Sequence, residues 1–367
     1  MNILILGGSG DLAVRKLLPA VPKSWTVTAY GRRKTTWKKL KRRSKAVCKG
    51  SYHSVDLLSY EWDNVQADIV YCALPSELYV NVLTRMPLSG QIVLCEKPVG
   101  RSTATAKKIL DKLSKLNADV RYIDHYLGKG ILDTFYFLHM ANPLLRNSWS
   151  TKHVEQITVH MRESMTARHR AEYYDQTGVV RDVVQNHALQ LIAHTLLTKH
   201  TNVSKTRAKL IDNLTVDSCR LGQYQPYHNN QTVATYADIM LSHAQWNKTR
   251  FRIIAGKGLD SKYTAVHIKM RQDCPTDVCP VADTIILELY PTPRVRLQMY
   301  TGPKTVRAID VPMNIATTQV TAYKNILTSM PSTQYVVSEQ EILAQWNVVN
   351  KCLKKRVTKQ YKRGEKV

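Results

Sequence analysis

The sequence has little cysteine, and it has no long apolar run. Only 7 of the 367 residues are cysteine, and the closest pair, Cys274 and Cys279, has no matching second pair. No zinc or other metal site is therefore expected, and the odd, irregular set of thiols favours a reducing, cytoplasmic compartment. No stretch approaches the roughly 20 apolar residues of a membrane span. The apolar opening, residues 1–6, follows no basic segment, so a signal peptide is not predicted.

Acidic residues are also scarce. There are 28 Asp and Glu against 53 Lys and Arg, which gives a formal net charge of +25. Residues 32–49 hold ten basic residues and no acidic one, and residues 351–366 hold eight basic residues against Glu365 alone. A net positive charge of this size favours polyanionic partners, but a run of like-charged residues is most often only a solvated stretch of the surface. Nucleic-acid binding is therefore not expected, and the basic tail, about 351–367, is expected to be mobile.

The first third of the chain alternates strand-like and helix-like segments. The strand-like runs occupy residues 3–6, 25–30, 69–74, 92–95 and 120–124. Two of them, residues 69–74 and 92–95, are continuously apolar, which is typical of central strands in a parallel sheet that helices cover on both sides. Helical spacing lies between them, and Ser102 is placed to cap a helix that runs to about Asn117. We therefore predict a Rossmann-type, doubly wound parallel sheet over residues 1–124.

The pattern changes after residue 124. Strand-like segments occur at residues 156–161, 233–241, 250–254, 266–270 and 285–289, and helices are predicted at 128–141, 179–197 and 340–352. Strands with short connections and few helices indicate an α+β domain, residues 125–367, with a large and mainly antiparallel sheet.

A glycine-rich motif joins the first predicted strand to the first predicted helix. Gly8, Gly10 and Ala13 match G-x-G-x-x-A. In that motif the second glycine lets the backbone approach a pyrophosphate, and the helix N-terminus stabilises its charge. A purely structural glycine turn is the alternative, but the strand–turn–helix context favours dinucleotide binding.

The end of the second predicted strand indicates which dinucleotide. An NAD site would place Asp or Glu there, whereas this chain has Arg32, Arg33 and Lys34 after Gly31. Guanidinium beside a ribose 2′-phosphate is the favourable pairing, so NADP is the expected cofactor and Arg32 the best candidate to bind it. A basic surface loop is the alternative interpretation.

Two further segments carry unusual polar residues. Asp124, His125, Tyr126 and Lys129 follow a predicted parallel strand at the sheet edge where such sheets bind ligands. The segment 181–190, Arg-Asp-Val-Val-Gln-Asn-His-Ala-Leu-Gln, is predicted to be a helix whose many polar side chains need partners. Taken singly, the first could be a surface loop and the second a core histidine with a capping aspartate.

Together, four segments resemble the signatures of the glucose-6-phosphate dehydrogenase family, in family order. They are Gly7–Ala13 (Gly-Gly-Ser-Gly-Asp-Leu-Ala), Glu96–Gly100 (Glu-Lys-Pro-Val-Gly), Ile123–Lys129 (Ile-Asp-His-Tyr-Leu-Gly-Lys) and Arg181–His187 (Arg-Asp-Val-Val-Gln-Asn-His). The resemblance implies NADP-dependent oxidation of D-glucose 6-phosphate to 6-phospho-D-glucono-1,5-lactone, in the oxidative pentose phosphate pathway. His187 resembles the general base that accepts the C1 hydroxyl proton, and Asp124 the carboxylate that orients it.

The resemblance implies roles for other positions as well. Substrate-binding residues would be Lys97, His125, Tyr126, Lys129, Glu163, Asp182 and Lys257. Cofactor-binding residues would be Gly7, Gly8, Ser9, Gly10, Asp11, Leu12, Arg32 and Lys97. The family is also the reason to expect a homo-oligomer, either a dimer or a tetramer.

The chain departs from the family in ways that leave two alternatives. It is shorter than typical members, mainly between residues 33 and 67 and between about 217 and 250. Residues near Tyr263 and Glu288 lack the basic ligands of a second, structural NADP site, so none is expected. The alternatives are the same chemistry on another sugar phosphate, because the trimmed loops could alter the pocket, and an inactive relative that binds polyanions.

Overall fold

The computed structural model describes residues 1–168, 171–198, 201–227, 230, 232–272, 283–302, 305–311, 319–329 and 334–366. Cys274 and Cys279 lie outside the described residues. The chain divides into two compact units, one made of Met1–Gly130 with Thr318–Leu343 and the other of Ile131–Thr317 with Ala344–Val367. Unit 1 therefore runs a few residues past the expected boundary at 124, and it also includes a segment that the sequence analysis assigned to the second domain.

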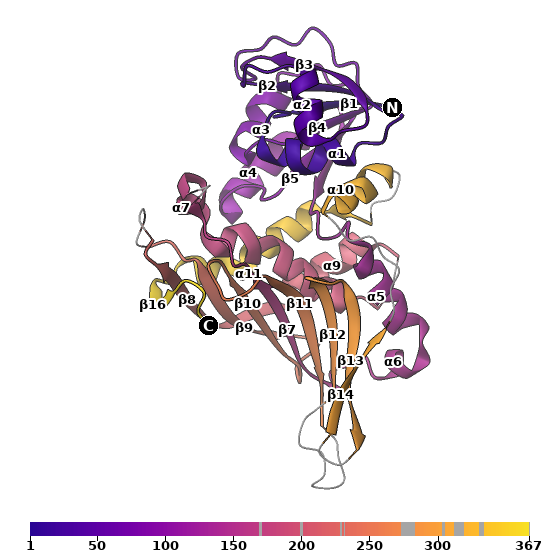
Figure 1. Cartoon of the computed structure of the whole chain (residues 1–367), viewed down its shortest axis with the longest axis vertical. Coiled ribbons are helices and arrows are strands. Elements are labelled where there is room, and N and C mark those ends of the chain that lie inside the picture. The colour runs from indigo at the N-terminus through magenta and orange to yellow at the C-terminus, as the bar shows by residue number, and fades with distance from the viewer. Residues whose placement is uncertain are drawn as a thin grey trace. The chain divides into compact units, whose positions relative to one another are not determined.

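Unit 1 holds a seven-stranded sheet in the order β15-β6-β5-β4-β1-β2-β3 (Figure 1). Its strands are β1 (Asn2–Leu6), β2 (Thr26–Gly31), β3 (Lys49–Ser54), β4 (Ile69–Cys72), β5 (Ile92–Glu96), β6 (Asp119–Ile123) and β15 (Val336–Val337). The first six pair in parallel, and β15 pairs antiparallel with β6. The predicted doubly wound parallel sheet is confirmed. The strand order reverses at β1, which has β2 on one side and β4 on the other.

Helices cover this sheet, whose strands β1, β4 and β5 are buried on both faces. They are the π-helix η1 (Ala13–Leu17), α1 (Leu18–Ala20), α2 (Trp37–Ser44), α3 (Ser76–Leu83), α4 (Thr103–Leu113) and α10 (Gln319–Thr328). Ile3, Ile5 and Val27 point to one face and share a buried cluster with residues of η1, α1 and α10. The predicted cap of α4 is confirmed, since the Ser102 hydroxyl accepts a hydrogen bond from the Thr105 amide at 3.3 Å.

Two elements of unit 1 lie in the basic run, where the sequence analysis expected only a solvated stretch. Both α2 and β3 fall within or beside residues 32–49. The buried apolar residues here are Leu40 on α2 and, between the two elements, Ala46 and Cys48, which are too few and too irregularly spaced to produce a clear periodic pattern.

Unit 2 holds a nine-stranded sheet in the order β14-β13-β12-β11-β7-β10-β9-β8-β16 (Figure 1). Its strands are β7 (Val154–Arg162), β8 (Leu214–Gln225), β9 (Tyr236–His243), β10 (Arg250–Gly256), β11 (Tyr263–Met270), β12 (Thr284–Tyr290), β13 (Arg294–Gly302), β14 (Thr305–Val311) and β16 (Val357–Lys362). All neighbouring pairs are antiparallel except β10 with β7 and β16 with β8. The predicted large, mainly antiparallel sheet is confirmed.

The remaining helices are α5 (Gly130–Ala141), α6 (Pro143–Asn147), α7 (Ala171–Val179), the π-helix η3 (Val180–Ala188), α8 (Leu189–Thr195), α9 (Val203–Asp212) and α11 (Glu339–Leu353). The helix predicted over 179–197 is formed by η3 and α8, which pack against β7 and, for η3, also against β10. Among the described residues, no helix is both long and apolar enough to cross a membrane.

The expectation of a mobile basic tail is wrong. Residues 357–362 form β16, which pairs in parallel with β8 at the edge of the sheet. Tyr361 anchors the strand, because its side chain is buried in a cluster with Tyr224 and Tyr236. The exposed basic side chains of the tail therefore lie on an ordered strand and on the residues beside it.

Candidate active site

The glycine-rich turn after β1 is held by backbone hydrogen bonds. The amides of Gly7 and Gly8 both donate to the Tyr30 carbonyl at 2.9 Å, and the Gly10 amide donates to the Gly7 carbonyl at 2.8 Å. Gly7 has a φ of +83°, a conformation that favours glycine. A Cβ on Gly8 would lie 2.6 Å from the Cβ of Ala29. The absence of a side chain at Gly8 therefore allows the turn to pack closely against β2.

A pocket in unit 1 opens beside this turn. Of the predicted cofactor residues, Gly7, Ser9, Gly10 and Arg32 line it. Arg33, which the sequence analysis noted beside Arg32, also lines it, as do residues that it missed, namely Asp56, Leu57, Leu58, Ala73, Leu74, Pro75, Leu78 and Val82. Asp56 to Leu58 follow β3, an element that the sequence pattern did not reveal, so no signal marked them.

Four other predicted cofactor residues, Gly8, Asp11, Leu12 and Lys97, do not line this pocket. Gly8 packs against Ala29, and the carboxylate of Asp11 pairs with Arg15 at 2.7 Å in an exposed ion pair. Leu12 packs against the buried cluster of unit 1.

The pocket residues fit a nicotinamide dinucleotide. Arg32 and Arg33 both line the pocket and are exposed, so their guanidinium groups are available to an anion. A Cβ on Gly31 would lie 2.7 Å from the Ser9 hydroxyl oxygen, so a side chain there would press on the turn. The combination of a glycine turn and adjacent arginines is suited to a pyrophosphate and a ribose phosphate.

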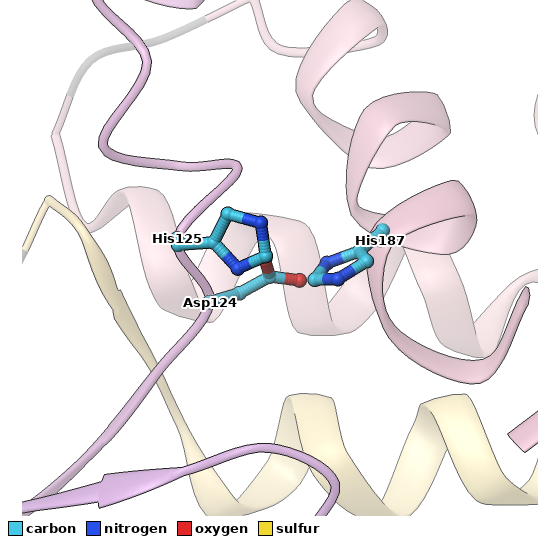
Figure 2. Close-up of side chains that lie close together, drawn as sticks. All are labelled: Asp124, His125 and His187. Atoms are coloured by element: carbon cyan, nitrogen blue, oxygen red, sulfur yellow. The ribbon is translucent and has the colours of Figure 1, made fainter. Parts of the chain in front are cut away.

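A second group of polar residues in unit 1 lies in the turn between β6 and α5. The amide of Tyr126 donates to the Asp124 carboxylate at 2.9 Å, and the amide of Leu127 donates to the Asp124 carbonyl at 3.0 Å. Asp124 is thus both a backbone and a side-chain acceptor in its own turn. Figure 2 shows the side chains of Asp124 and His125 leaving this part of the chain.

Helix α10, which the sequence analysis did not predict, supports the turn from behind. A Cβ on Gly128 would lie 2.4 Å from the Ala322 carbonyl oxygen, so only glycine allows this approach. The Asn325 side-chain amide donates to the Gly128 carbonyl at 2.9 Å. The ring of Tyr323 stacks on that of His125 with centroids 5.6 Å apart.

Cations surround the carboxylate of Asp124. Burial raises its pKa, and the positive charges of His125, Lys97 and Lys129 together with the Tyr126 amide act in the opposite direction. Lys129 is itself buried, and its ammonium lies 3.9 Å from the centre of the Tyr126 ring. The structure therefore brings the predicted residues Asp124, His125, Tyr126 and Lys129 into one turn, with Lys97 close enough to act on the carboxylate.

Glu96 is a buried acid that the sequence analysis quoted in a motif but did not place in the site. Its carboxylate accepts hydrogen bonds from Tyr71 at 2.7 Å and from Tyr323 at 3.0 Å. Burial raises its pKa, while the two tyrosine hydroxyls and Lys97 lower it. Tyr323 also stacks on His125, so the hydrogen bond from Tyr323 to Glu96 fixes the ring that packs against the turn between β6 and α5.

In unit 2, the helix η3 carries the other predicted polar residues. Asp182, Gln185, Asn186 and His187 are all buried, so the helix is enclosed on every side. The side-chain carbonyl of Asn186 accepts from the His187 amide at 2.7 Å, and its amide group donates to the Arg181 carbonyl at 3.0 Å. A π-helix of this kind is rare and occurs frequently at functional sites. Figure 2 shows the imidazole of His187 on this helix.

A lysine and two carboxylates form a cluster in the same unit. The ammonium of Lys257, which follows β10, pairs with the carboxylate of Glu163 and lies 3.7 Å from that of Asp182. Its backbone is fixed as well, because Tyr361 donates to the Lys257 carbonyl at 2.7 Å. Three residues predicted to bind sugar are thus brought together from β10, the end of β7 and η3.

Tyr174 of α7 is a further polar residue at this cluster, and the sequence analysis did not include it. The Lys257 ammonium lies 5.4 Å from the centre of its ring. Its hydroxyl is buried and has no hydrogen-bond partner in the part of the chain that the structure describes. Its neighbour Asp175 accepts a hydrogen bond from the Tyr227 hydroxyl at 2.6 Å.

Comparisons with known proteins agree with these observations. The family model described as glucose-6-phosphate dehydrogenase, NAD binding domain, matches residues 49–133, and the one described as the C-terminal domain matches residues 136–366. A glucose-6-phosphate 1-dehydrogenase of Ceratitis capitata is 28% identical over 76% of this chain, and one of Dictyostelium discoideum is 26% identical over 74%. The matches span 66% and 69% of the lengths of those relatives, so the chain corresponds to about two thirds of each.

A solved structure has the same fold. A glucose-6-phosphate dehydrogenase in complex with its substrate glucose 6-phosphate superposes with a TM-score of 0.86 at 20% identity, covering 100% of this chain and 95% of that one. The C-terminal family model alone spans more than half of the chain, and both sheets match the family fold. The chain therefore belongs to the glucose-6-phosphate dehydrogenase family.

Proposed function

We propose that this protein oxidises D-glucose 6-phosphate to 6-phospho-D-glucono-1,5-lactone, with NADP as the hydride acceptor. The observation that carries the proposal is the burial of the ionisable residues in the family signatures. Asp124, Lys129, Asp182 and His187 are only 1%, 8%, 9% and 5% exposed. Burying such groups is unfavourable unless they are paired or used, and both conditions are met in an enzyme site.

His187 is the proposed general base. An imidazole has an unperturbed pKa of about 6.5, so it can accept the C1 hydroxyl proton near neutral pH. As that proton moves to His187, hydride leaves C1 and the C1–O bond becomes the lactone carbonyl. The Asn186 side chain accepts a hydrogen bond from the His187 amide and so fixes the helix turn that carries the imidazole. Asp124 is proposed to orient the imidazole and to stabilise the imidazolium that forms.

The two polar clusters are proposed to hold the substrate at its two ends. His125, Tyr126 and Lys129 offer cation, hydroxyl and backbone donors to the phosphate. Lys257, with the carboxylates of Glu163 and Asp182, offers donors and acceptors to the sugar and its phosphate. Lys97, which acts on Asp124 electrostatically, is proposed to contact both substrate and cofactor.

NADP is proposed to bind in the pocket of unit 1, with Arg32 on the 2′-phosphate. When bound, the cofactor supplies the nicotinamide ring that accepts hydride. Gly7, Ser9 and Gly10 would lie along the pyrophosphate, and Arg33 would share the charge of the 2′-phosphate.

Cofactor reduction measured by absorbance tests this function. With glucose 6-phosphate, we expect turnover with NADP at a kcat/KM far above that with NAD, because no carboxylate follows β2 to accept from a ribose 2′-hydroxyl. Galactose 6-phosphate and free glucose serve as controls and should be poor substrates. Equal efficiency with both cofactors would reject the role of Arg32, and a preference for another sugar phosphate would reject the substrate.

Assembly and location follow from the same proposal. We expect a cytoplasmic homo-oligomer, either a dimer or a tetramer. Sedimentation of the purified protein tests the assembly, and a monomer at micromolar concentration would reject it.

A further inference from the structure

The proposed function makes no use of the basic residues on α2. This helix carries four exposed cations, Lys38, Lys39, Arg42 and Arg43, which we name the α2 basic face. Lys45 and Lys49, also exposed, continue the charge beyond the helix. A dehydrogenase does not need this concentration of charge for hydride transfer.

The geometry of α2 gathers these cations on one side. Thr36 caps the helix by accepting from the Lys39 amide at 3.4 Å, and Leu40 and Ser44 are its buried residues. At about 100° per residue, the four cations fall within an arc of about 140° on the opposite side. Figure 1 shows α2 beside the sheet of unit 1, where it contacts η1, α1 and β3.

The charge of this face is not balanced by the protein. Within the described residues, none of the ten cations between 32 and 49 has a carboxylate oxygen within 4.0 Å. Lys38 with Arg42, and Lys39 with Arg43, are like charges four residues apart, an arrangement that destabilises a helix. The helix dipole favours cations only in the last turn, so it does not explain Lys38 and Lys39. An external anion would relieve this repulsion.

We infer that the α2 basic face binds the phosphate backbone of a nucleic-acid strand. A row of cations matches an anion that repeats along its length, and no single small anion contacts all of them. An anionic membrane is a poorer match, because surface-binding helices insert apolar side chains, whereas the exposed side chains of α2 are all cationic. The inference goes beyond the proposed function and does not depend on it.

Fluorescence anisotropy with a labelled poly-uridine strand tests the inference on the full chain. The test variant replaces the four cations by glutamine, as K38Q, K39Q, R42Q and R43Q. The matched control removes the same number of charges from exposed positions of the C-terminal segment, as K354Q, R356Q, K359Q and K366Q. Both variants carry the same net charge, so only the position of the lost charge differs.

We expect the α2 variant to bind at least about 10-fold more weakly and the control to change little. The slope of log affinity against log salt should become flatter by about 3 in the α2 variant, since each lost phosphate contact contributes about 0.7 for a single strand. The pair variant K38Q with R42Q should show about half of that change, which keeps the test valid if the fourfold variant folds poorly.

Three results would overturn the inference. Equal weakening in both fourfold variants would mean that net charge alone attracts the strand. Binding to phosphatidylserine vesicles without binding to poly-uridine would assign the face to a membrane. Absence of poly-uridine binding by the unaltered protein at low salt would dismiss the site.

Discussion

The charged side chains of the candidate site are buried or half-buried, and they have close electrostatic partners. Asp124 has an amide donor and three cations near its carboxylate, and Lys257 has two carboxylates near its ammonium. Removing one partner of such a buried pair leaves the other without compensation, which is more costly than the pair is stabilising. Substitutions in the site should therefore be chosen to separate an effect on substrate from an effect on folding.

Lys129→Ala tests the proposed phosphate site. Loss of a charge-assisted hydrogen bond to phosphate, about 1.5 to 3 kcal/mol, should lower kcat/KM for glucose 6-phosphate by about 10- to 100-fold. The value for free glucose, which has no phosphate, should change far less. Lys107→Ala, on the exposed side of α4, is the matched control and should leave both values unchanged. Equal losses on the two sugars would remove Lys129 from this role.

Glu96→Gln tests whether the pKa of the buried Glu96 carboxyl is raised, through the pH dependence of stability. Burial raises the pKa of Glu96 above the 4.5 of a free side chain, so the folded state holds its proton more tightly than the unfolded state. The contribution of Glu96 to stability therefore falls as pH rises from about 4.5 through the raised folded pKa. Glutamine has no such titration.

Urea unfolding across a pH series measures this effect. The free energy of unfolding of the variant minus that of the unaltered protein should grow with pH through this interval and then level off. A difference that is constant from pH 4 to pH 9 would show that Glu96 has an ordinary pKa.

At the scale of elements, three segments hold the site residues in place, and they differ in how visible they were. The sequence predicted a helix over η3 but not its π form. His187 and its polar neighbours on this helix are buried. The sequence analysis did not predict α10, although five of its ten residues are apolar, and nothing in the local sequence links this helix to the turn at Gly128. Strand β16 was mistaken for a solvated tail because basic residues surround Tyr361.

Tyr361→Phe tests the role of β16. The Tyr361 hydroxyl donates to the Lys257 carbonyl and lies 2.8 Å from the Thr235 hydroxyl. Its loss leaves buried polar atoms unpaired, so we expect the free energy of unfolding to fall by about 1 to 3 kcal/mol. Lys359→Gln, exposed on the same strand, should change it by less than about 0.5 kcal/mol. Chemical denaturation measures both, and equal stability of Tyr361→Phe and the unaltered protein would contradict this anchoring role.

At the scale of the molecule, the sequence predicted both sheets but not the division between units. Apolar runs mark β1, β4 and β5, β2 and β6 continue the alternation of strands and helices, and the pattern ends at residue 124. Unit 1, however, also includes residues 318–343 from far along the chain. Within that segment, β15 pairs with the sheet through only Val336 and Val337. Two residues leave no periodic signal, so a single sequence cannot show which sheet they extend. Strand β3 was missed because Tyr52 is the single apolar residue in its sequence, Lys-Gly-Ser-Tyr-His-Ser.

The signature residues could be located from the sequence because short motifs keep fixed spacing whatever the fold around them. Asp124 to Lys129 and Asp182 to His187 were found in this way. Asp56 and Tyr174 were not, because their relevance depends on how the fold brings separate segments of the chain together. A pocket or an unpartnered buried hydroxyl becomes visible only in three dimensions.

The central claim of the proposed function is that a carboxylate from unit 1 and an imidazole from unit 2 act as one catalytic pair. A double-mutant cycle of turnover with Asp124→Asn, His187→Asn and the double variant measures this directly, with the thermal midpoint and the KM for glucose 6-phosphate as controls for folding and binding. If Asp124 acts through His187, loss of the base should lower kcat by about 100-fold or more. The double variant should then be no slower than His187→Asn alone. A double variant whose loss equals the product of the two single losses would show that the residues act independently, and it would contradict the account.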